Sequence, residues 1–334
     1  MYGILGSAIV RRNGDAMVRL ADDYRRSVVF LGWPENTTSN LLNPQGTGFF
    51  IEMPFGRYIV TAGHVADLFK NTPNDSETGP FGIRLNDKNG YGRIERIDSA
   101  HFHYHPHYPA IDVAIMEFEP PPWAEAAVVP TDVFLSDLKM ESKDIGTGDL
   151  AYVVGLFWLL SGKQRNLPIV HTGHVAGFPE GEVIPIKGSA PILGYLVEAN
   201  AIEGASGSPV FVRRTLIGEA KQIKDGATVN TWNHGAAFLL GLWVGAWNER
   251  AEIGGIDKEI PRGIGIVTPA TCILEVLDMP ELRSRRDQRR TQKDQSRAAK
   301  LARAYASKSE KTVLGDFDVL ARTAERPLVV GRGH

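Results

Sequence analysis

Short β-rich runs separated by turn residues dominate the first part of the chain, and they constrain its fold most strongly. Each run holds four to seven residues, is rich in aliphatic or aromatic side chains, and is separated from the next without an intervening helix. The turn signal is clear at Asn86–Gly90, and Pro120–Pro122 ends the series because proline cannot donate to a strand ladder. Six such strands indicate a closed antiparallel barrel. The runs are Ser27–Leu31, Gly48–Met53, Tyr58–Ala62, Gly82–Leu85, Ile94–Ile97 and Asp112–Phe118.

A second series of six runs repeats this pattern further along the chain. A helix is expected to follow it, from Thr268 or Pro269 to about Leu277, and another is expected over residues 13–26, where four side chains share one stripe. The predicted fold is therefore all-β, with two six-stranded antiparallel β-barrels, a terminal helix at each end and a basic C-terminal tail. The second series comprises Leu150–Gly155, Ile169–Val175, Tyr195–Glu198, Ser208–Val212, Phe238–Trp243 and Gly263–Val267.

A serine flanked by glycines lies within the second series. Ser206 follows Gly204 by two residues, precedes Gly207 directly, and leads into the apolar run Val210–Val212. Glycines let a backbone turn sharply and aim its N–H groups at one point, which is what an oxyanion hole requires. A serine hydroxyl alone is a poor nucleophile, so a catalytic role also needs a base and an orienting acid.

Both of these groups are present upstream of the serine. His64 comes at the end of the apolar run Tyr58–Ala62. Asp112 opens a run of buried character, where an unpartnered carboxylate would be costly and an imidazole would offset that cost. The order His64, Asp112, Ser206 is the order of a chymotrypsin-type catalytic triad.

Three sequence blocks together resemble the signature blocks of trypsin-like serine peptidases. Flanking stretches are similar to the neighbouring strands of that family, so the likeness covers about residues 27–278. The signature blocks are Thr61–His64, Asp112–Ile115 and Gly204–Pro209, and the flanking stretches are Gly46–Ile51, Leu240–Gly245 and Gly263–Pro269.

The resemblance implies a serine endopeptidase that works through an acyl-enzyme intermediate. In that family the serine, here Ser206, attacks the scissile carbonyl, and the histidine, here His64, acts as general base and then as general acid. Asp112 would orient the imidazole, and the backbone N–H groups of Gly204 and Ser206 would hold the oxyanion. The two barrels would place His64 and Asp112 on one side of a cleft and Ser206 on the other.

The resemblance also indicates the specificity pocket. Asn200 lies six residues before Ser206, at the position that the family places at the base of its primary pocket. A neutral residue there disfavours basic substrates, so we expect apolar or small side chains at the cleavage position. The pocket wall, which would also pair with substrate backbone as an added strand, consists of Val244, Gly245 and Ala246. Ala205 departs from the digestive relatives, which carry there an aspartate that pairs with a cleaved N-terminus.

A trypsin-fold module that captures peptides without turnover is the alternative function. An intact set of triad residues argues against it, since mere binding would not require all three residue types. A distorted oxyanion loop could still silence the site. Reaction with a fluorophosphonate probe separates the two hypotheses.

Composition and the N-terminal sequence indicate the expected cell compartment. The chain has 334 residues, a net charge of −2 and one cysteine, Cys272, so it forms no intramolecular disulfide. Since secreted relatives carry several disulfides, and the start of the sequence has no basic signal-peptide pattern, a cytoplasmic location is expected. No stretch approaches the ~20 apolar residues that a membrane span needs. The triad chemistry implies no cofactor.

Four alternating histidines raise the question of a metal site. His101, His103, His105 and His107 would all face one side of a strand. However, ligands in one straight row cannot close a tetrahedron around zinc, and Pro106 interrupts the strand within the row. We therefore expect no metal there.

The C-terminal stretch differs in charge from the rest of the chain. Residues 281–312 hold 11 Lys or Arg and 4 Asp or Glu, a local net charge of +7, which leaves about −9 for the remainder. A solvated, partly helical or disordered tail is one interpretation. The other is a docking arm, residues 283–311, for an acidic partner, a nucleic-acid backbone or a membrane surface. Besides a protein or peptide substrate, we expect no specific nucleic acid and no membrane span.

These observations divide the chain into four expected parts. They are an N-terminal helical segment (1–26), a first barrel with His64 and Asp112 (27–125), a second barrel with Ser206 and the closing helix (126–280), and the basic tail (281–334).

Overall fold

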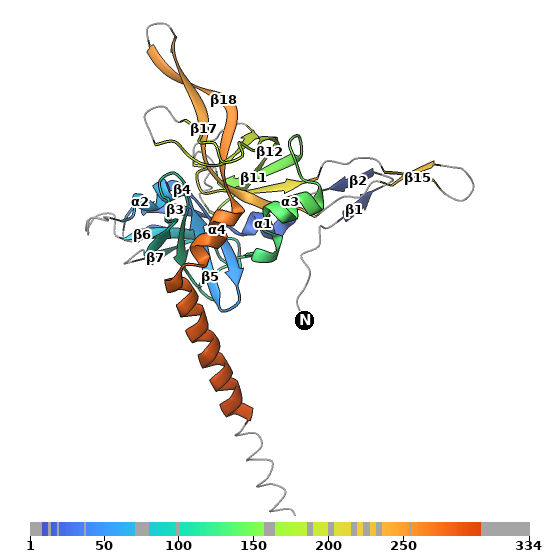
Figure 1. Ribbon diagram of the computed structural model, residues 1–334. Helices are drawn as coiled ribbons and strands as arrows, with labels where there is room; N and C mark the ends of the chain where they lie inside the picture. The colour runs from blue at the N-terminus through green and yellow to red at the C-terminus, as the bar shows by residue number, and fades with distance from the viewer. Residues whose placement is uncertain are drawn as a thin grey trace, which may run out of the picture. The chain divides into compact units, whose positions relative to one another are not determined.

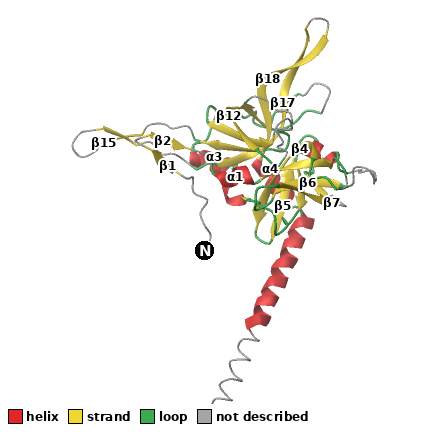
Figure 2. Ribbon diagram, turned by 180° about the vertical axis from the view of Figure 1, so that it is seen from behind, coloured by secondary structure: helices red, strands yellow, loops and turns green. Residues whose placement is uncertain are grey.

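The structure is a computed structural model, and the chain divides into two compact units, Met1–Met279 and Pro280–His334. Strands dominate the first unit (Figure 2). The structure describes residues 9–12, 15–18, 20–36, 38–70, 80–97, 101–156, 164–185, 190–199, 204–214, 219–222, 228–231, 236–253 and 256–301.

An eight-stranded sheet forms the first half of unit 1. Its strand order is β7-β6-β3-β4-β5-β9-β8, and β10 pairs in parallel with β4. Aliphatic and aromatic side chains fill the central strands, and Phe49 and Ile59 are fully buried. The strands are β3 (Val28–Pro34), β4 (Leu42–Met53), β5 (Gly56–Thr61), β6 (Phe81–Asn86), β7 (Gly92–Ile97), β8 (Phe102–Tyr104), β9 (Ala114–Glu117) and β10 (Val129–Pro130).

The predicted first barrel is not shown in this half. Among the described strands the sheet runs from β7 to β8 without closing, and it has eight strands instead of six. β8 has only three residues and pairs with β9 alone. The chain then turns through residues 105–110, where Pro106 and Pro109 have no N–H to donate to a ladder.

The second half of unit 1 is a closed six-stranded barrel, as predicted. Its order is β11-β12-β13-β18-β17-β14, and its centre is a cluster of buried aliphatic residues that includes Val153, Val197, Val210 and Val267. The strands are β11 (Leu150–Leu156), β12 (Pro168–Gly177), β13 (Tyr195–Glu198), β14 (Pro209–Arg213), β17 (Phe238–Ile253) and β18 (Ile256–Pro269).

Three two-stranded segments add to these sheets. β17 and β18 are far longer than the expected strands 238–243 and 263–267, and they continue beyond the barrel as a paired ribbon (Figure 1). β15 (Glu219–Gln222) pairs with β16 (Thr228–Thr231), and β1 (Ile9–Arg12) pairs with β2 (Asp15–Val18).

The predicted helix over residues 13–26 is wrong for its first half. Residues 15–18 form strand β2, and only Asp22–Arg26 form helix α1. The pairing of Arg12 with Asp15 leaves a two-residue connection whose sequence is Asn13-Gly14. That dipeptide is the favoured sequence of a tight β-hairpin turn, and it outweighs the apolar stripe that suggested a helix.

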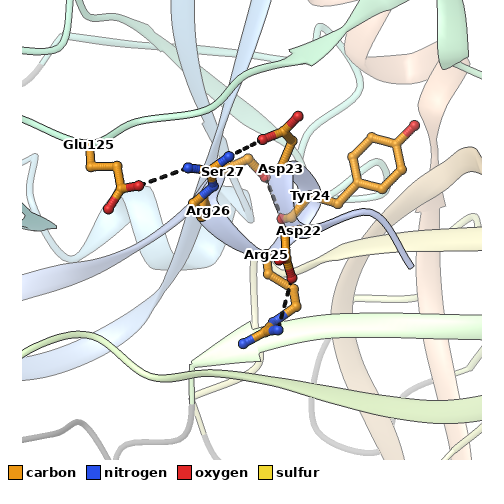
Figure 3. Close-up of polar contacts among 7 residues, drawn as sticks. All are labelled: Asp22, Asp23, Tyr24, Arg25, Arg26, Ser27 and Glu125. Carbon is orange, nitrogen blue, oxygen red and sulfur yellow. Dashed lines mark hydrogen bonds and ion pairs between the residues drawn. The ribbon is translucent and has the colours of Figure 1, made fainter. Parts of the chain in front are cut away.

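Helix α1 connects the N-terminal segment to both halves of unit 1. Arg26 donates to Glu125 at 2.7 Å, and Ser27 Oγ donates to the Tyr24 carbonyl at 2.8 Å (Figure 3). Tyr24 is buried, and its ring stacks on Phe211 of β14 at a centroid distance of 4.2 Å. The helix therefore supports the strand that follows the serine loop.

The other helices are short, except at the C-terminal end. α4 packs against β17 and β9, and it closes the barrel after β18. In unit 2, residues 280–301 are helical, and every residue from 287 to 301 is exposed. No helix in the described ranges has the length and apolar character to cross a membrane. The short elements are α2 (Gly63–Asp67), the 3₁₀ turn η1 (Thr131–Val133), α3 (Asp137–Lys143) and α4 (Ala270–Leu277).

Candidate active site

The structure brings His64 and Asp112 together at one end of two paired strands. β5 and β9 are antiparallel neighbours, with Thr61 opposite Ala114. His64 follows the end of β5 by three residues, as the second residue of α2, and Asp112 precedes β9 by two. Asp112 was expected to open the strand, but β9 begins at Ala114, so the aspartate lies in the preceding loop.

A single carboxylate holds both the ring and the backbone of the histidine. His64 Nδ1 lies 2.6 Å from Asp112 Oδ2, and the His64 backbone N–H donates to Asp112 Oδ1 at 2.9 Å. The aspartate side chain is 5% exposed, whereas the histidine side chain is 46% exposed. A neutral imidazole whose Nδ1–H faces a carboxylate keeps the Nε2 lone pair free to accept a proton.

Close packing behind the histidine requires a glycine. A Cβ atom on Gly63 would lie 2.4 Å from Tyr108 Cε2 and 2.9 Å from Asp112 Oδ1. Tyr108 is itself held, because its hydroxyl donates to Asp67, which also pairs with Lys70 at 2.6 Å. The small residue before His64 therefore lets the aspartate approach the imidazole.

The serine loop is attached to the first half of the unit through Thr47 of β4. The Thr47 N–H donates to the Ser206 carbonyl at 2.9 Å, and Thr47 Oγ1 donates to the Gly204 carbonyl at 2.7 Å. On the other side, Thr61 Oγ1 donates to the Thr47 carbonyl at 2.8 Å. Thr47, which is fully buried, thus joins the strand that ends before His64 to the loop that carries Ser206.

Backbone conformation shapes the serine loop. Gly204 and Gly207 have φ angles of 88° and 87°, in the left-handed region that favours glycine. A Cβ on Gly207 would lie 2.0 Å from the Thr47 carbonyl oxygen, so no larger residue fits there. The Gly207 N–H donates to the Trp243 carbonyl at 2.7 Å, which ties the loop to β17.

The loop leaves two candidate oxyanion donors available. In the part of the chain that the structure describes, the backbone N–H groups of Gly204 and Ser206 donate to no backbone acceptor, whereas the Ser208 N–H donates to the Ala205 carbonyl at 2.8 Å. The side chain of Ser206 is half-buried. Within the same described residues, no hydrogen bond joins Ser206 Oγ to His64 Nε2.

The predicted pocket wall lies on β17, directly after its last contact with the serine loop. The Trp243 N–H donates to the Ser208 carbonyl at 2.8 Å, and Val244, Gly245 and Ala246 follow. A Cβ added to Gly245 would meet nothing within 4 Å, so open space lies beside this backbone. Asn200, the predicted pocket base, lies outside the described residues.

The four histidines do not form one row. β8 ends at Tyr104, and the chain turns, so His105 is buried while His101 and His107 are exposed. His105 Nε2 lies 2.7 Å from Glu275 Oε2, and Nδ1 accepts a hydrogen bond from the His107 N–H at 3.1 Å. The neutral ring therefore carries its proton on Nε2 and donates it to Glu275 of α4.

One group of metal-ligating atoms occurs among the described residues. The ligand atoms of His105, Cys272 and Glu275 lie within 4.8 Å of one another. A metal-binding imidazole normally donates its other ring N–H to an acceptor, but Nδ1 of His105 faces the N–H of His107. Burial raises the pKa of the Cys272 thiol to about 11, and the negative charge of Glu275 is the second cause of this increase. The thiol therefore stays protonated. These residues fit a hydrogen-bonded link from α4 to the aspartate loop better than a metal site.

Sequence reasoning missed two sets of contacts that support the site, those of Thr47 and those of the pair His105–Glu275. Thr47 stands in the stretch that resembled the family strand before the histidine, and its place between two glycines was the available signal. The partnership of His105 with Glu275 joins residues 170 positions apart, so no local pattern could have revealed it.

A buried carboxylate that is hydrogen-bonded to an exposed imidazole, together with a serine loop shaped by two glycines, is consistent with a peptidase fold. A model of the trypsin-like peptidase domain matches residues 46–218, which is just over half of the chain and includes His64, Asp112 and Ser206. The chain therefore belongs to the trypsin-like peptidase domain family. A comparison with curated proteins gave no match.

Proposed function

We propose that the protein is a serine endopeptidase that uses Ser206 as nucleophile, His64 as base and Asp112 as the orienting acid. The observation that carries this proposal is that Asp112 contacts His64 twice. Its Oδ2 lies 2.6 Å from the ring Nδ1, and its Oδ1 accepts a hydrogen bond from the backbone N–H at 2.9 Å. A carboxylate that was only a loop cap would not need to fix the tautomer of an exposed imidazole. The Thr47 bridge supports the proposal by joining the histidine strand to the serine loop.

The proposed chemistry follows from the direction of these hydrogen bonds. Because Asp112 accepts the Nδ1 proton, Nε2 of His64 takes the Ser206 hydroxyl proton as Oγ attacks the scissile carbonyl. The imidazolium then gives that proton to the leaving amine, and Asp112 stabilises the imidazolium charge. Water, activated by the same histidine, hydrolyses the acyl-enzyme and restores the serine.

The oxyanion and the substrate backbone would be held by main-chain groups. The amides of Gly204 and Ser206 are proposed as oxyanion donors, and one such donor contributes about 2.7–4 kcal/mol to catalysis. Val244, Gly245 and Ala246 are proposed to pair with substrate as an added strand. A neutral Asn200 at the pocket base would favour apolar or small residues at the cleavage position.

A fluorophosphonate probe tests the nucleophile directly. The probe should label the wild-type protein at Ser206 and leave Ser206→Ala unlabelled, and peptide mapping by mass spectrometry gives the site. Ser208→Ala is the matched control, because the Ser208 hydroxyl is buried and makes no hydrogen bond to any residue that the structure describes. Labelling at another residue, or equal labelling of Ser206→Ala, would overturn the assignment.

A peptide-binding module without turnover is the second candidate function. It is favoured by one observation, that no hydrogen bond joins Ser206 Oγ to His64 Nε2 within the described residues. Such bonds are often long before substrate binds, so this geometry does not argue strongly for it. A folded wild-type protein that binds unstructured peptide and resists the probe would favour this function.

The basic segment is proposed as a docking arm for an acidic partner, independent of catalysis. Four basic residues of the helix in unit 2 recur at spacings of three and four, so they share one exposed face. With few apolar side chains on this segment, the attraction would be electrostatic and sensitive to salt. The residues are Arg290, Lys293, Arg297 and Lys300.

A further inference from the structure

A cavity of about 420 Å³ lies in unit 1, beside the segment that leads to Asp112. Its walls come from helix α3, from the residues that follow β12 and precede β13, and from the start of α4. Its volume is within the range of about 300–1,000 Å³ that small-molecule sites usually have. The residues that line it include neither the proposed triad nor the predicted pocket wall on β17. The cavity is therefore distinct from the candidate active site.

Apolar and aromatic side chains form most of the cavity wall. Phe178 and Tyr195 both line it, and their rings meet edge to face at a centroid distance of 4.8 Å. Met140, Leu193 and Ile111 add aliphatic surface. A ligand that fills this space therefore needs an apolar body, because apolar surface is stabilised by removal from water.

The charged residues that line the cavity are all acidic. They are Asp137, Glu180 and Glu182, and among the described residues of the wall there is no Lys, Arg or His. All three acids are exposed, and within the described ranges none of them forms an ion pair. Burial, followed by the negative charge of Asp137, raises the pKa of Tyr195 to about 12, so this charge acts on the interior of the cavity. Charges of one sign around a low-dielectric space attract a ligand of the opposite sign.

The cavity adjoins the main chain around Asp112. The Leu193 N–H donates to the Ala110 carbonyl at 2.8 Å, and Thr268 Oγ1 donates to the Asp112 carbonyl at 3.3 Å. Leu193 lines the cavity, and so does Pro269, which follows Thr268. An occupant would thus lie against the segment that carries Asp112.

We propose that this cavity binds a small organic cation with an alkylated ammonium head and an apolar body. Aromatic rings and carboxylates both attract such a head, and the pair Phe178–Tyr195 and the three acids provide both. The body would fill the aliphatic part of the wall. Since none of these residues takes part in the proposed catalysis, the site does not depend on the peptidase function.

Calorimetric titration of the full-length protein tests the class of ligand. The probes are benzyltrimethylammonium, the neutral benzyl alcohol and the anionic phenylacetate, which share a phenyl body and differ in the charge of the head. We expect the dissociation constant of the cation to be at least about fivefold lower than that of the alcohol. Phenylacetate should bind more weakly than the alcohol. No binding of the cation, or equal binding of all three probes, would overturn the proposal.

The methyl signals of the methionines show where the cation binds. The NMR signal of Met140, assigned with Met140→Leu, should shift as benzyltrimethylammonium is added. The signal of Met116 in β9, assigned in the same way, is the control and should not shift, because Met116 is buried and does not line the cavity. Binding that leaves the Met140 signal unchanged would place the cation elsewhere and reject this site.

Neutralising the acidic residues tests their part in the selection of a cation. The variant Asp137→Asn/Glu180→Gln/Glu182→Gln should keep its fold, because all three side chains are exposed. It should lose the preference for the cation over benzyl alcohol and keep its affinity for the alcohol. A control variant with the same change in net charge should retain the preference, and an equal loss in both variants would contradict a local site. The control substitutions are Glu35→Gln, Glu119→Gln and Glu141→Gln, which are exposed and lie outside the cavity.

Phe178→Leu tests the aromatic contribution, because leucine is apolar but has no ring. The ratio of the dissociation constants of alcohol and cation should fall about threefold or more. Since both constants are measured on the same variant, partial unfolding would not change their ratio. An unchanged ratio would show that the rings do not recognise the head, which would overturn the choice of an alkylated ammonium.

Discussion

The two halves of unit 1 hold their candidate catalytic residues in different ways. In the first half, a side chain positions the residue, because the Asp112 carboxylate is hydrogen-bonded to both the ring and the backbone N–H of His64. In the second half, the backbone does it, because Thr47 and Trp243 bind the main chain around Ser206, and two glycines give the loop its conformation. Substitutions should therefore act through lost polar contacts in the first half and through backbone strain in the second.

The largest effect should come from removing either reacting side chain. We expect Ser206→Ala and His64→Ala each to lower kcat by about 10⁶, as for the corresponding residues of other serine peptidases. The double variant should lose no more than either single one, because the two residues act as a unit. Steady-state hydrolysis of an unstructured protein measures all three. Losses that multiply would show that the two halves do not form one site.

Asp112→Asn should lower kcat by about 10⁴, a smaller loss, since the amide would favour the wrong imidazole tautomer. The fold should survive, because asparagine has nearly the same shape. Asp67→Asn is the control: it removes a carboxylate that binds Tyr108 and Lys70 but does not touch His64. Turnover of a small ester substrate by both variants gives the comparison. Equal losses would mean that Asp112 has no specific role.

Gly207→Ala should act on the backbone instead. The new Cβ would meet the Thr47 carbonyl at 2.0 Å in a left-handed conformation, so we expect about 2–4 kcal/mol lower stability. Gly181→Ala is the control, with a φ of 88° but no atom within 4 Å of its Cβ; it should cost only about 1–2 kcal/mol. Urea unfolding monitored by tryptophan fluorescence measures both. Equal free energies of unfolding for the two variants would show that the serine loop does not pack closely against β4.

Asn200→Asp should change which peptide bonds are cut while the catalytic machinery remains. A carboxylate at the pocket base would attract Arg or Lys, and without such a cation it would sit unpaired. Cleavage-site profiling by mass spectrometry on one unfolded protein should show a shift towards basic residues. If the natural protein already cleaves strictly after Arg or Lys, Asn200 is not at the pocket base.

The sequence predicted the second half of the fold better than the first. Each of the six predicted strands there has a counterpart in the closed barrel, because aliphatic runs between turn residues specify strands well. In the first half the strands were also placed closely, but their number and closure were not, since these depend on pairing between distant segments. The two residues of β10, parallel to β4, leave almost no periodic signal.

The candidate site divides in the same way. The pairing of His64 with Asp112 could be predicted because one follows a strand-like run and the other directly precedes one, each in a characteristic local sequence. The catalytic role of Ser206 stays a prediction. The contacts of Thr47 and the His105–Glu275 link could not be predicted, because their partners lie far along the chain and their residue types are common. The ribbon of β17 and β18 was missed because its charged residues lack the alternation of a half-buried strand.

The last comparison is between unit 1 and the basic tail, and it predicts no change in catalysis. The triad residues, the serine loop and helix α4 all precede Met279, where the first compact unit ends. A chain cut after about Leu282 should therefore fold and turn over peptide as the intact protein does.

What should change is association with acidic partners, because residues 281–312 carry +7 and the remainder about −9. Intact and truncated proteins are compared for turnover and then for retention on an anionic matrix across a salt series. Retention of the intact protein should fall steeply with salt. Replacing Arg290, Lys293 and Arg297 by glutamine in the full chain is the control, and it should weaken retention without shortening the protein. An inactive truncated protein would place the tail within the fold, and equal retention at low salt would leave the basic face without a docking role.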